Sequence, residues 1–154
     1  IGKDVKIHDS ANIEGPVIIG DKSIIGCDAY LRGPVIIGRG CIIARSDLKN
    51  SIIFDQVFAE HFNYIGDSIL GNNVNLGAGS KLANLRFDWK NIKVNYKGKK
   101  IPTGLQKLGS IVGDKSQLGC NCVLNPATIL GKSCFVYPLT CIRAKFYSSK
   151  SIIK

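Results

Sequence analysis

The segment EHFNYIGDS, residues 60–68, places a histidine and a tyrosine three positions apart, His61 and Tyr64. A histidine titrates near neutrality, so its imidazole can act as a general base. The chain has only two histidines, and the other, His8, lacks such a neighbourhood and is interpreted as an ordinary surface residue. On composition alone, a surface histidine on one face of a repeat is the favoured interpretation of His61 too. The choice depends on the elements that position it.

An aliphatic residue recurs at every sixth position of the first part of the chain. The series is Ile1, Ile7, Ile13, Ile19, Ile25, Leu31, Ile37 and Ile43, and six-residue spacing resumes at Leu70 and again at Val112. A helix would need apolar spacings of three and four. The spacing of six predicts short strands joined by tight turns, with three strands forming one triangular coil of about 18 residues. About six or seven coils are expected on that basis.

The repeat breaks in two places. The first is SDLKNS, residues 46–51, where the phase shifts by four. The second runs from Asp88 to Ser110 and holds six lysines and a single acid. Long excursions from a compact solenoid are usually functional or mobile. Charge alone leaves two interpretations open: a solvated hairpin with KGKK as its turn, or a loop that holds a phosphate.

Composition limits the class of protein further. The chain has 154 residues and 45% hydrophobic residues, enough for one domain with a sizeable core, residues 1–154. It contains no apolar run of membrane length and no recognisable signal peptide, which favours the cytoplasm. It has no methionine and begins in register with its repeat, which suggests the C-terminal domain of a longer protein.

Charge and cysteine content give two further expectations. The net charge of +10 fits either a lysine-rich surface or an anionic ligand. Nucleic acid is disfavoured because aromatic residues are few and no nucleic-acid motif occurs. The six cysteines lack a paired zinc-binding spacing. Cys41, Cys122 and Cys134 fall on the small-residue position of the repeat, so buried free thiols are expected there, although a disulfide between coils stays open.

The repeat resembles the hexapeptide-repeat left-handed parallel β-helix, an all-β fold whose hand does not follow from periodicity. The blocks HFNYIGDS, GNNVNLGAGSKLANLRFDWKNIKV and KKIPTGLQKLGSIVGD are also specific in residue type and spacing. They resemble the acetyltransferase domain of bifunctional sugar-1-phosphate nucleotidylyltransferase/acetyltransferases, particularly the archaeal type, from about Gly33 to Pro138. The family includes the bacterial glucosamine-1-phosphate acetyltransferase/uridylyltransferases.

This resemblance implies roles for several residues. His61 matches the general base of the family, and Asn84, in the later segment LANLR, matches an asparagine that helps hold the amino sugar. Tyr64 matches a tyrosine that contacts the sugar phosphate, and Lys90 matches a lysine that binds its phosphate. Lys93 matches a further lysine of the archaeal-type enzymes.

Other matches surround these five. Lys49 corresponds to a family lysine that precedes the histidine, and Arg32 resembles a family arginine at a spacing that differs by one residue. Asp47 is a candidate to orient the imidazole. Ala78 fits the small residue beside acetyl-CoA, whereas Cys120 stands where the bacterial enzymes have a serine near the thioester. A backbone contact to acetyl-CoA would survive that change, but a hydroxyl contact would not.

The implied reaction is transfer of acetyl from acetyl-CoA to the 2-amino group of glucosamine 1-phosphate or galactosamine 1-phosphate, on the path to UDP-N-acetyl-hexosamine. The resemblance also implies a homotrimer with sites between subunits and no metal requirement. Nothing in the chain resembles the nucleotidyltransferase domain. The rival hypothesis is a non-catalytic β-helix that trimerises or regulates a sugar-phosphate nucleotidyltransferase. A different acyl acceptor on the same fold is a third.

Overall fold

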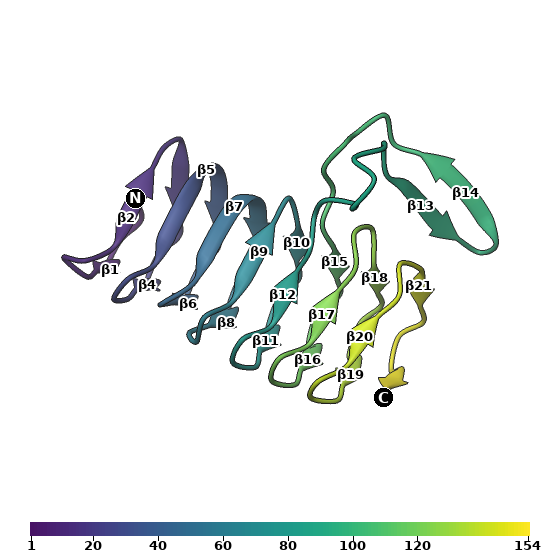
Figure 1. Ribbon diagram of the computed structural model, residues 1–154. Helices are drawn as coiled ribbons and strands as arrows, with labels where there is room; N and C mark the ends of the chain where they lie inside the picture. The colour runs from purple at the N-terminus through teal and green to yellow at the C-terminus, as the bar shows by residue number, and fades with distance from the viewer.

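The chain folds as a solenoid of short parallel strands, with one hairpin projecting from it (Figure 1). The computed structural model describes residues 1–154. It contains no helix, and therefore none long and apolar enough to cross a membrane. Stacked strands form three faces, which are called the first, second and third face in the order in which the chain follows them.

The strands of each face pair in parallel. The first face contains β1 (Lys6–Ile7), β4 (Ile24–Ile25), β6 (Ile42–Ile43), β8 (Phe58–Ala59), β11 (Asn75–Leu76), β16 (Gln117–Leu118), β19 (Phe135–Val136) and β22 (Ile152–Ile153). The second contains β2 (Asn12–Glu14), the beginnings of β5 (Tyr30–Ile37) and β7 (Asp47–Ile53), and then β9 (Tyr64–Gly66), β12 (Lys81–Leu82), β17 (Val123–Leu124) and β20 (Cys141–Ile142). The third contains β3 (Val17–Ile19), the ends of β5 and β7, and then β10 (Ile69–Leu70), β15 (Ile111–Val112), β18 (Ile129–Leu130) and β21 (Phe146–Tyr147).

The first face stacks eight strands, so the solenoid has eight coils rather than the expected six or seven. The difference arises because several coils are shorter than the full three-hexad length. Asp47 pairs with Tyr64, whereas Ile111 pairs with Ile129, so the coil that begins at Asp47 lacks one position of the full repeat. In addition, the eighth coil consists only of the short C-terminal strand β22 and is therefore incomplete.

The phase shift at residues 46–51 has a physical cause in these shorter coils. The inward residues Ile43, Leu48 and Ile53 are five positions apart, and all three are buried. Each of these two steps is one residue shorter than the six-residue repeat. Together they move the phase of the repeat back by two positions, which is equivalent to a shift forward by four. The chain therefore keeps one continuous core through the break.

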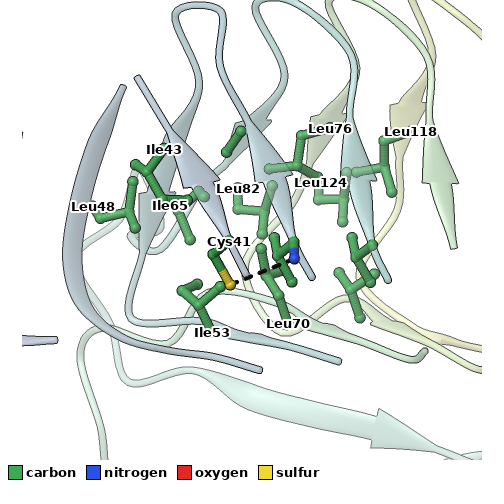
Figure 2. Packing of buried hydrophobic residues seen from close by; sticks show 14 of the residues in the cluster. Cys41, Ile43, Leu48, Ile53, Ile65, Leu70, Leu76, Leu82, Leu118 and Leu124 are labelled. Atoms are coloured by element: carbon green, nitrogen blue, oxygen red, sulfur yellow. Dashed lines mark hydrogen bonds between the residues drawn. The ribbon is translucent and has the colours of Figure 1, made fainter. Parts of the chain in front are cut away.

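The core is a column of aliphatic side chains inside the triangular coils. On the second face, Leu48 stacks on Ile65, Ile65 on Leu82, and Leu82 on Leu124. Figure 2 shows these side chains converging in the interior with those of the other two faces. The cluster contains 26 buried residues. Burial of one such side chain contributes roughly 1.5–3 kcal/mol, so the column holds the coils in register.

Cysteines complete this core as small side chains, as expected. Cys41, Cys122 and Cys134 are buried, and all six thiols are free. The sulfur of Cys41 accepts a hydrogen bond from the Val57 backbone N–H, drawn in Figure 2. Burial raises the pKa of the Cys41 thiol.

The excursion forms an arm that leaves the solenoid at Asn84 and returns at Leu108, where the Leu108 N–H donates to the Asn84 carbonyl at 3.0 Å. It is thus shifted from the predicted 88–110. The arm ends in an antiparallel hairpin of β13 (Lys93–Tyr96) and β14 (Lys99–Pro102), with its turn inside the predicted KGKK segment. Tyr96 packs edge-on against Phe146 of the last coils, with ring centroids 5.1 Å apart.

Candidate functional site

The candidate site lies on the outward side of the second face, between two corners of the solenoid. One corner, between the first and second faces, carries His61 and is called the histidine corner. The other, between the second and third faces, carries Asn50 and Asp67 and gives rise to the arm, so it is called the arm corner. Strand register aligns outward side chains of successive coils: Asp47 pairs with Tyr64, and Arg32 with Lys49.

Arg32 and Asp47 form a two-pronged ion pair on this face. The Arg32 Nε donates to Asp47 Oδ1 at 3.0 Å, and Nη2 donates to Oδ2 at 2.6 Å. About a third of each side chain is exposed. The hydrogen bonds to Asp47 raise the pKa of the Arg32 guanidinium. This pair fixes one cation at the edge of the site, although partial exposure to solvent limits its contribution to stability.

A second group joins Tyr64, Asn84, Asp67 and Lys49 across neighbouring coils. The Tyr64 hydroxyl donates to Asn84 Oδ1 at 3.3 Å, and Asn84 Nδ2 donates to Asp67 Oδ2. The Lys49 ammonium lies 3.7 Å from Asp67 Oδ2. Gly66 makes room for this arrangement, because a Cβ there would lie 2.6 Å from both the Tyr64 Oη and the Asn84 Nδ2.

Tyr64 carries a perturbed hydroxyl. Partial burial raises its pKa, and the nearby Asp47 carboxylate raises it further, while Arg32 acts in the opposite direction. Tyr64 is therefore neutral at physiological pH and offers a hydroxyl rather than a charge to a ligand.

His61 lies at the histidine corner, just before Tyr64, with its side chain exposed to solvent. Its backbone carbonyl accepts from the Gly79 N–H at 2.7 Å, which ties it to the next coil. The imidazole makes no hydrogen bond within the chain. Asp47 is bonded to Arg32 and not to His61, so the orienting role expected for Asp47 stays a prediction.

Ala78 and Cys120 occupy the positions equivalent to His61 in the next two coils of the same corner. The Asn121 N–H donates to the Ala78 carbonyl at 2.7 Å, and the Leu139 N–H donates to the Cys120 carbonyl at 2.9 Å. The backbone N–H groups of Ala78 and Cys120 have no acceptor in the chain. Strand spacing of about 4.8 Å separates successive members of this column. The structure therefore brings His61, Ala78 and Cys120 together along one edge.

Lys90 and Lys93 stand apart from these groups, on the arm. Lys90 is exposed, and its backbone N–H donates to Asp88 Oδ1 at 3.3 Å. Lys93 lines a groove of about 570 Å³ between the arm and the last coils, together with Arg86 and Arg143. No hydrogen bond or ion pair joins either lysine to His61, Tyr64 or Asn84 within the chain.

Sequence reasoning missed Asp67 and Gly66. Asp67 receives hydrogen bonds from Asn50 and Asn84, and its side chain is only 9% exposed. Both residues stand in the segment YIGDS, directly after Tyr64. The five-residue spacing of inward residues at this corner, from Ile65 to Leu70, is the signal that could have marked it as unusual.

Comparison with known proteins agrees with this architecture. Residues 1–97 match the family described as GMPPB C-terminal domain. A "bifunctional sugar-1-phosphate nucleotidylyltransferase/acetyltransferase" of Sulfurisphaera tokodaii is 40% identical over 151 residues, covering 86% of this chain and 38% of the relative. The "bifunctional protein GlmU" of Methanocaldococcus jannaschii is 33% identical over 150 residues, covering 85% of this chain and 36% of the relative. The chain thus spans a little over a third of the length of these curated relatives.

Solved structures show the same fold at low sequence identity. The acetyltransferase domain of PglB from Neisseria gonorrhoeae, in complex with acetyl coenzyme A, superposes with a TM-score of 0.54 at 14% identity, covering 96% of this chain and 55% of that one. PerB from Caulobacter crescentus, in complex with CoA and GDP-perosamine, gives a TM-score of 0.54 at 17% identity, covering 96% of this chain and 52% of that one.

The fold is therefore the left-handed parallel β-helix that the hexad repeat resembles, which confirms the expected fold. The chain belongs to the GMPPB C-terminal domain family. Its relatives are bifunctional sugar-1-phosphate nucleotidylyltransferase/acetyltransferases of the GlmU type, as the resemblance predicted.

Proposed function

We propose that this domain transfers acetyl from acetyl-CoA to the 2-amino group of an amino-sugar 1-phosphate, either glucosamine 1-phosphate or galactosamine 1-phosphate. The observation that carries the proposal is the second face itself. It presents Arg32, Lys49, Tyr64 and Asn84 next to a corner that bears an unbonded histidine. Relatives named for both nucleotidylyl and acetyl transfer support the same reaction class.

The proposed acceptor site recognises a small anionic sugar. Arg32 and Lys49 supply positive charge on neighbouring coils, and Tyr64 and Asn84 supply hydrogen-bonding groups beside them. Lys90 and Lys93 add cations from the arm. Several fixed contacts to one ligand hold its amine near the acetyl carbon, and such positioning is a large part of catalysis for a two-substrate reaction.

His61 is the proposed general base. The acceptor amine is an ammonium near neutral pH and must lose a proton before it attacks the thioester. An exposed imidazole that is free of other bonds can take that proton, which contributes roughly a hundred- to ten-thousand-fold in rate. The attack forms the new C–N bond and breaks the C–S bond, and coenzyme A leaves as the thiol.

Acetyl-CoA fits the histidine corner as co-substrate. The N–H groups of Ala78 and Cys120 are free donors on the same edge as His61, suited to carbonyl oxygens of the cofactor arm or to the developing oxyanion. Both contacts use the backbone, so the cysteine at position 120 does not impair them. No metal is required by this chemistry. The six free thiols fit a reducing compartment such as the cytoplasm, which we propose as the site of action.

The proposed assembly is a homotrimer whose sites lie between subunits. Within one chain, no hydrogen bond or ion pair joins Lys90 or Lys93 to His61, Tyr64 or Asn84, and in the proposed trimer a second copy brings these lysines to the sugar phosphate. Phe87 and Trp89, beside Lys90 on the arm, are strongly exposed, and an aromatic pair of this kind is suited to contact with another subunit. Closed symmetry is the usual arrangement for such contacts.

A thiol-release assay tests the proposal. Acetyl-CoA is offered with glucosamine 1-phosphate or galactosamine 1-phosphate in separate reactions, and free coenzyme A is measured. His61→Ala should abolish most release, whereas His8→Ala, which changes the other histidine, should leave it intact. Release with either sugar identifies the acceptor.

Absence of release with both sugars, from a folded protein, would contradict the proposal. It would favour the rival hypothesis, a non-catalytic trimerising or regulatory β-helix of a sugar-phosphate nucleotidyltransferase.

A further inference from the structure

We propose that Asp67 is a positioning residue of this site, which sets the direction of the Asn84 amide and the place of the Lys49 ammonium. The inference rests on the proposed function for its kinetic consequences, but its geometry stands independently. No role was assigned to Asp67 from the sequence, yet its carboxylate contacts three side chains at the arm corner: Lys49, Asn50 and Asn84.

The position of Asp67 is fixed by its backbone. Its N–H donates to the Lys49 carbonyl, and its carbonyl accepts from the Gly109 N–H, both at 2.8 Å. Its φ is +46°, a left-handed conformation that aspartate and asparagine adopt more readily than other side chains. The carboxylate is thus held between the preceding coil and the base of the arm.

An ionised carboxylate can only accept hydrogen bonds, so the atom of Asn84 that faces Asp67 must be the nitrogen. The Asn84 oxygen then faces Tyr64, and an amide oxygen also only accepts. The Tyr64 hydroxyl therefore donates its single proton to Asn84 at 3.3 Å. Its oxygen keeps lone pairs for a ligand group that donates, such as a sugar hydroxyl or the ammonium of the acceptor.

Asp67 also fixes the position of the Lys49 ammonium. Its Oδ2 lies 3.7 Å from the Lys49 ammonium, and both side chains are mostly buried, at 9% and 29% exposed. The pair holds Lys49 beside Arg32 of the neighbouring coil. It also competes with any phosphate for Lys49. The Asp67 carboxylate therefore orders the site but weakens the binding of an anionic ligand to Lys49.

Asp67→Asn is the informative substitution, because asparagine keeps the size and tolerates the same backbone conformation. The variant allows the Asn84 amide to turn over and releases Lys49. We expect kcat for acetyl transfer to fall by about ten- to a hundredfold, as for misplacement of reacting groups by about 1 Å. The KM for the sugar phosphate should stay equal or fall, because Lys49 no longer faces a competing carboxylate.

Asp114→Asn is the matched control. Asp114 also accepts from an asparagine side chain, that of Asn72, and pairs with a lysine, Lys132, but at the corner between the third and first faces. Its replacement should leave kcat and KM at the wild-type values. A wild-type kcat in Asp67→Asn, or a raised KM with kcat unchanged, would overturn the positioning role.

A measurement on the unmodified protein separates this inference from the proposed function. In nitrogen-15 spectra, one of the two side-chain amide hydrogens of Asn84 should exchange slowly with solvent, because it is bonded to Asp67. Asp67→Asn should abolish that protection, and Asp114→Asn should not. Equal, fast exchange of both hydrogens in the wild-type protein would refute the geometry, whether or not the domain transfers acetyl groups.

Discussion

Gly66→Ala should reduce acetyl transfer while the β-helix stays folded. A Cβ at this position would lie 2.6 Å from the Tyr64 Oη and from the Asn84 Nδ2, whereas ordinary contact begins at 3.4 Å. The two groups must therefore retreat by 3.4 − 2.6 = 0.8 Å if the backbone stays in place. Their mutual hydrogen bond is already 3.3 Å long and would be broken. Misplacement of about 1 Å can cost about a hundredfold in rate, which is the expected loss in kcat.

The fold should tolerate this change because the atoms nearest to the added methyl group belong to side chains, and Gly66 has no positive φ. We expect a destabilisation of about 1 kcal/mol, at the low end for an overpacked site. Thiol release gives kcat, and thermal unfolding followed by circular dichroism gives the stability.

Gly71→Ala is the control with the opposite outcome. Its Cβ would meet the Asp114 carboxylate and backbone N–H at 2.6 and 2.7 Å, away from the site. It should lower the melting temperature without changing kcat per folded molecule. A Gly66→Ala variant with wild-type kcat would refute the assignment of Tyr64 and Asn84 to the acceptor site.

Three further outcomes are expected. Mass determination in solution should give three times the 16.7 kDa chain mass. If His61 and Lys90 of one site come from different subunits, mixed trimers of inactive His61→Ala and Lys90→Ala chains should regain roughly a quarter of the active sites. Complete inactivity of the mixed trimers would place both residues in one subunit. Lys90→Ala should raise the KM for the sugar phosphate about tenfold or more without altering that for acetyl-CoA, while Lys100→Ala on the same arm should change neither. The hydrogen bond from Lys132 lowers the pKa of Asp114, so the contribution of the ionised Asp114 to stability is present at neutral pH and is lost as the pH falls below about 4. The free energy of unfolding of Asp114→Asn, measured in urea, should therefore depend less on acid pH than that of the wild type. An equal pH dependence of the two proteins would contradict this role of Asp114.

The hexad pattern predicts the triangular coils, because the side chain at the inward position of each strand must be apolar to fill the core, but the hand of the β-helix came from the resemblance. Ile25, Leu31, Ile37 and Ile43 are all fully or nearly fully buried, as their spacing indicated. The number of coils was underestimated because turn length is set locally. Removal of one residue from a corner leaves the core intact, so composition does not reveal it.

The residue roles in the candidate site come only from the resemblance and stay predictions. Arg32, Asp47, Lys49, Tyr64 and Asn84 do converge on one face, although they come from four successive coils. Their convergence follows from strand register, which a periodic sequence specifies. The contacts of Asp67 could not be foreseen, because they depend on the backbone conformation of the arm corner. The distance between the arm lysines and His61 depends on the direction in which the arm leaves the solenoid, and no local pattern determines that direction.

Stability and function are coupled on the second face through this register. Asp47, Lys49 and Tyr64 each stand next to a core residue, Leu48 or Ile65, that stacks on the coils above and below. Because side chains alternate between the two sides of a strand, a slip of one residue would bury the polar groups and expose the aliphatic ones. The same core column that stabilises the fold therefore holds the proposed acceptor site to within the tolerance that catalysis by positioning requires. The arm is under a looser constraint, because its strands do not stack on the core column and it is held only by the hydrogen bond at its base and by the packing of Tyr96 on Phe146. A difference in acceptor sugar between relatives is for this reason expected to arise from changes on the arm, while the second face keeps the chemistry.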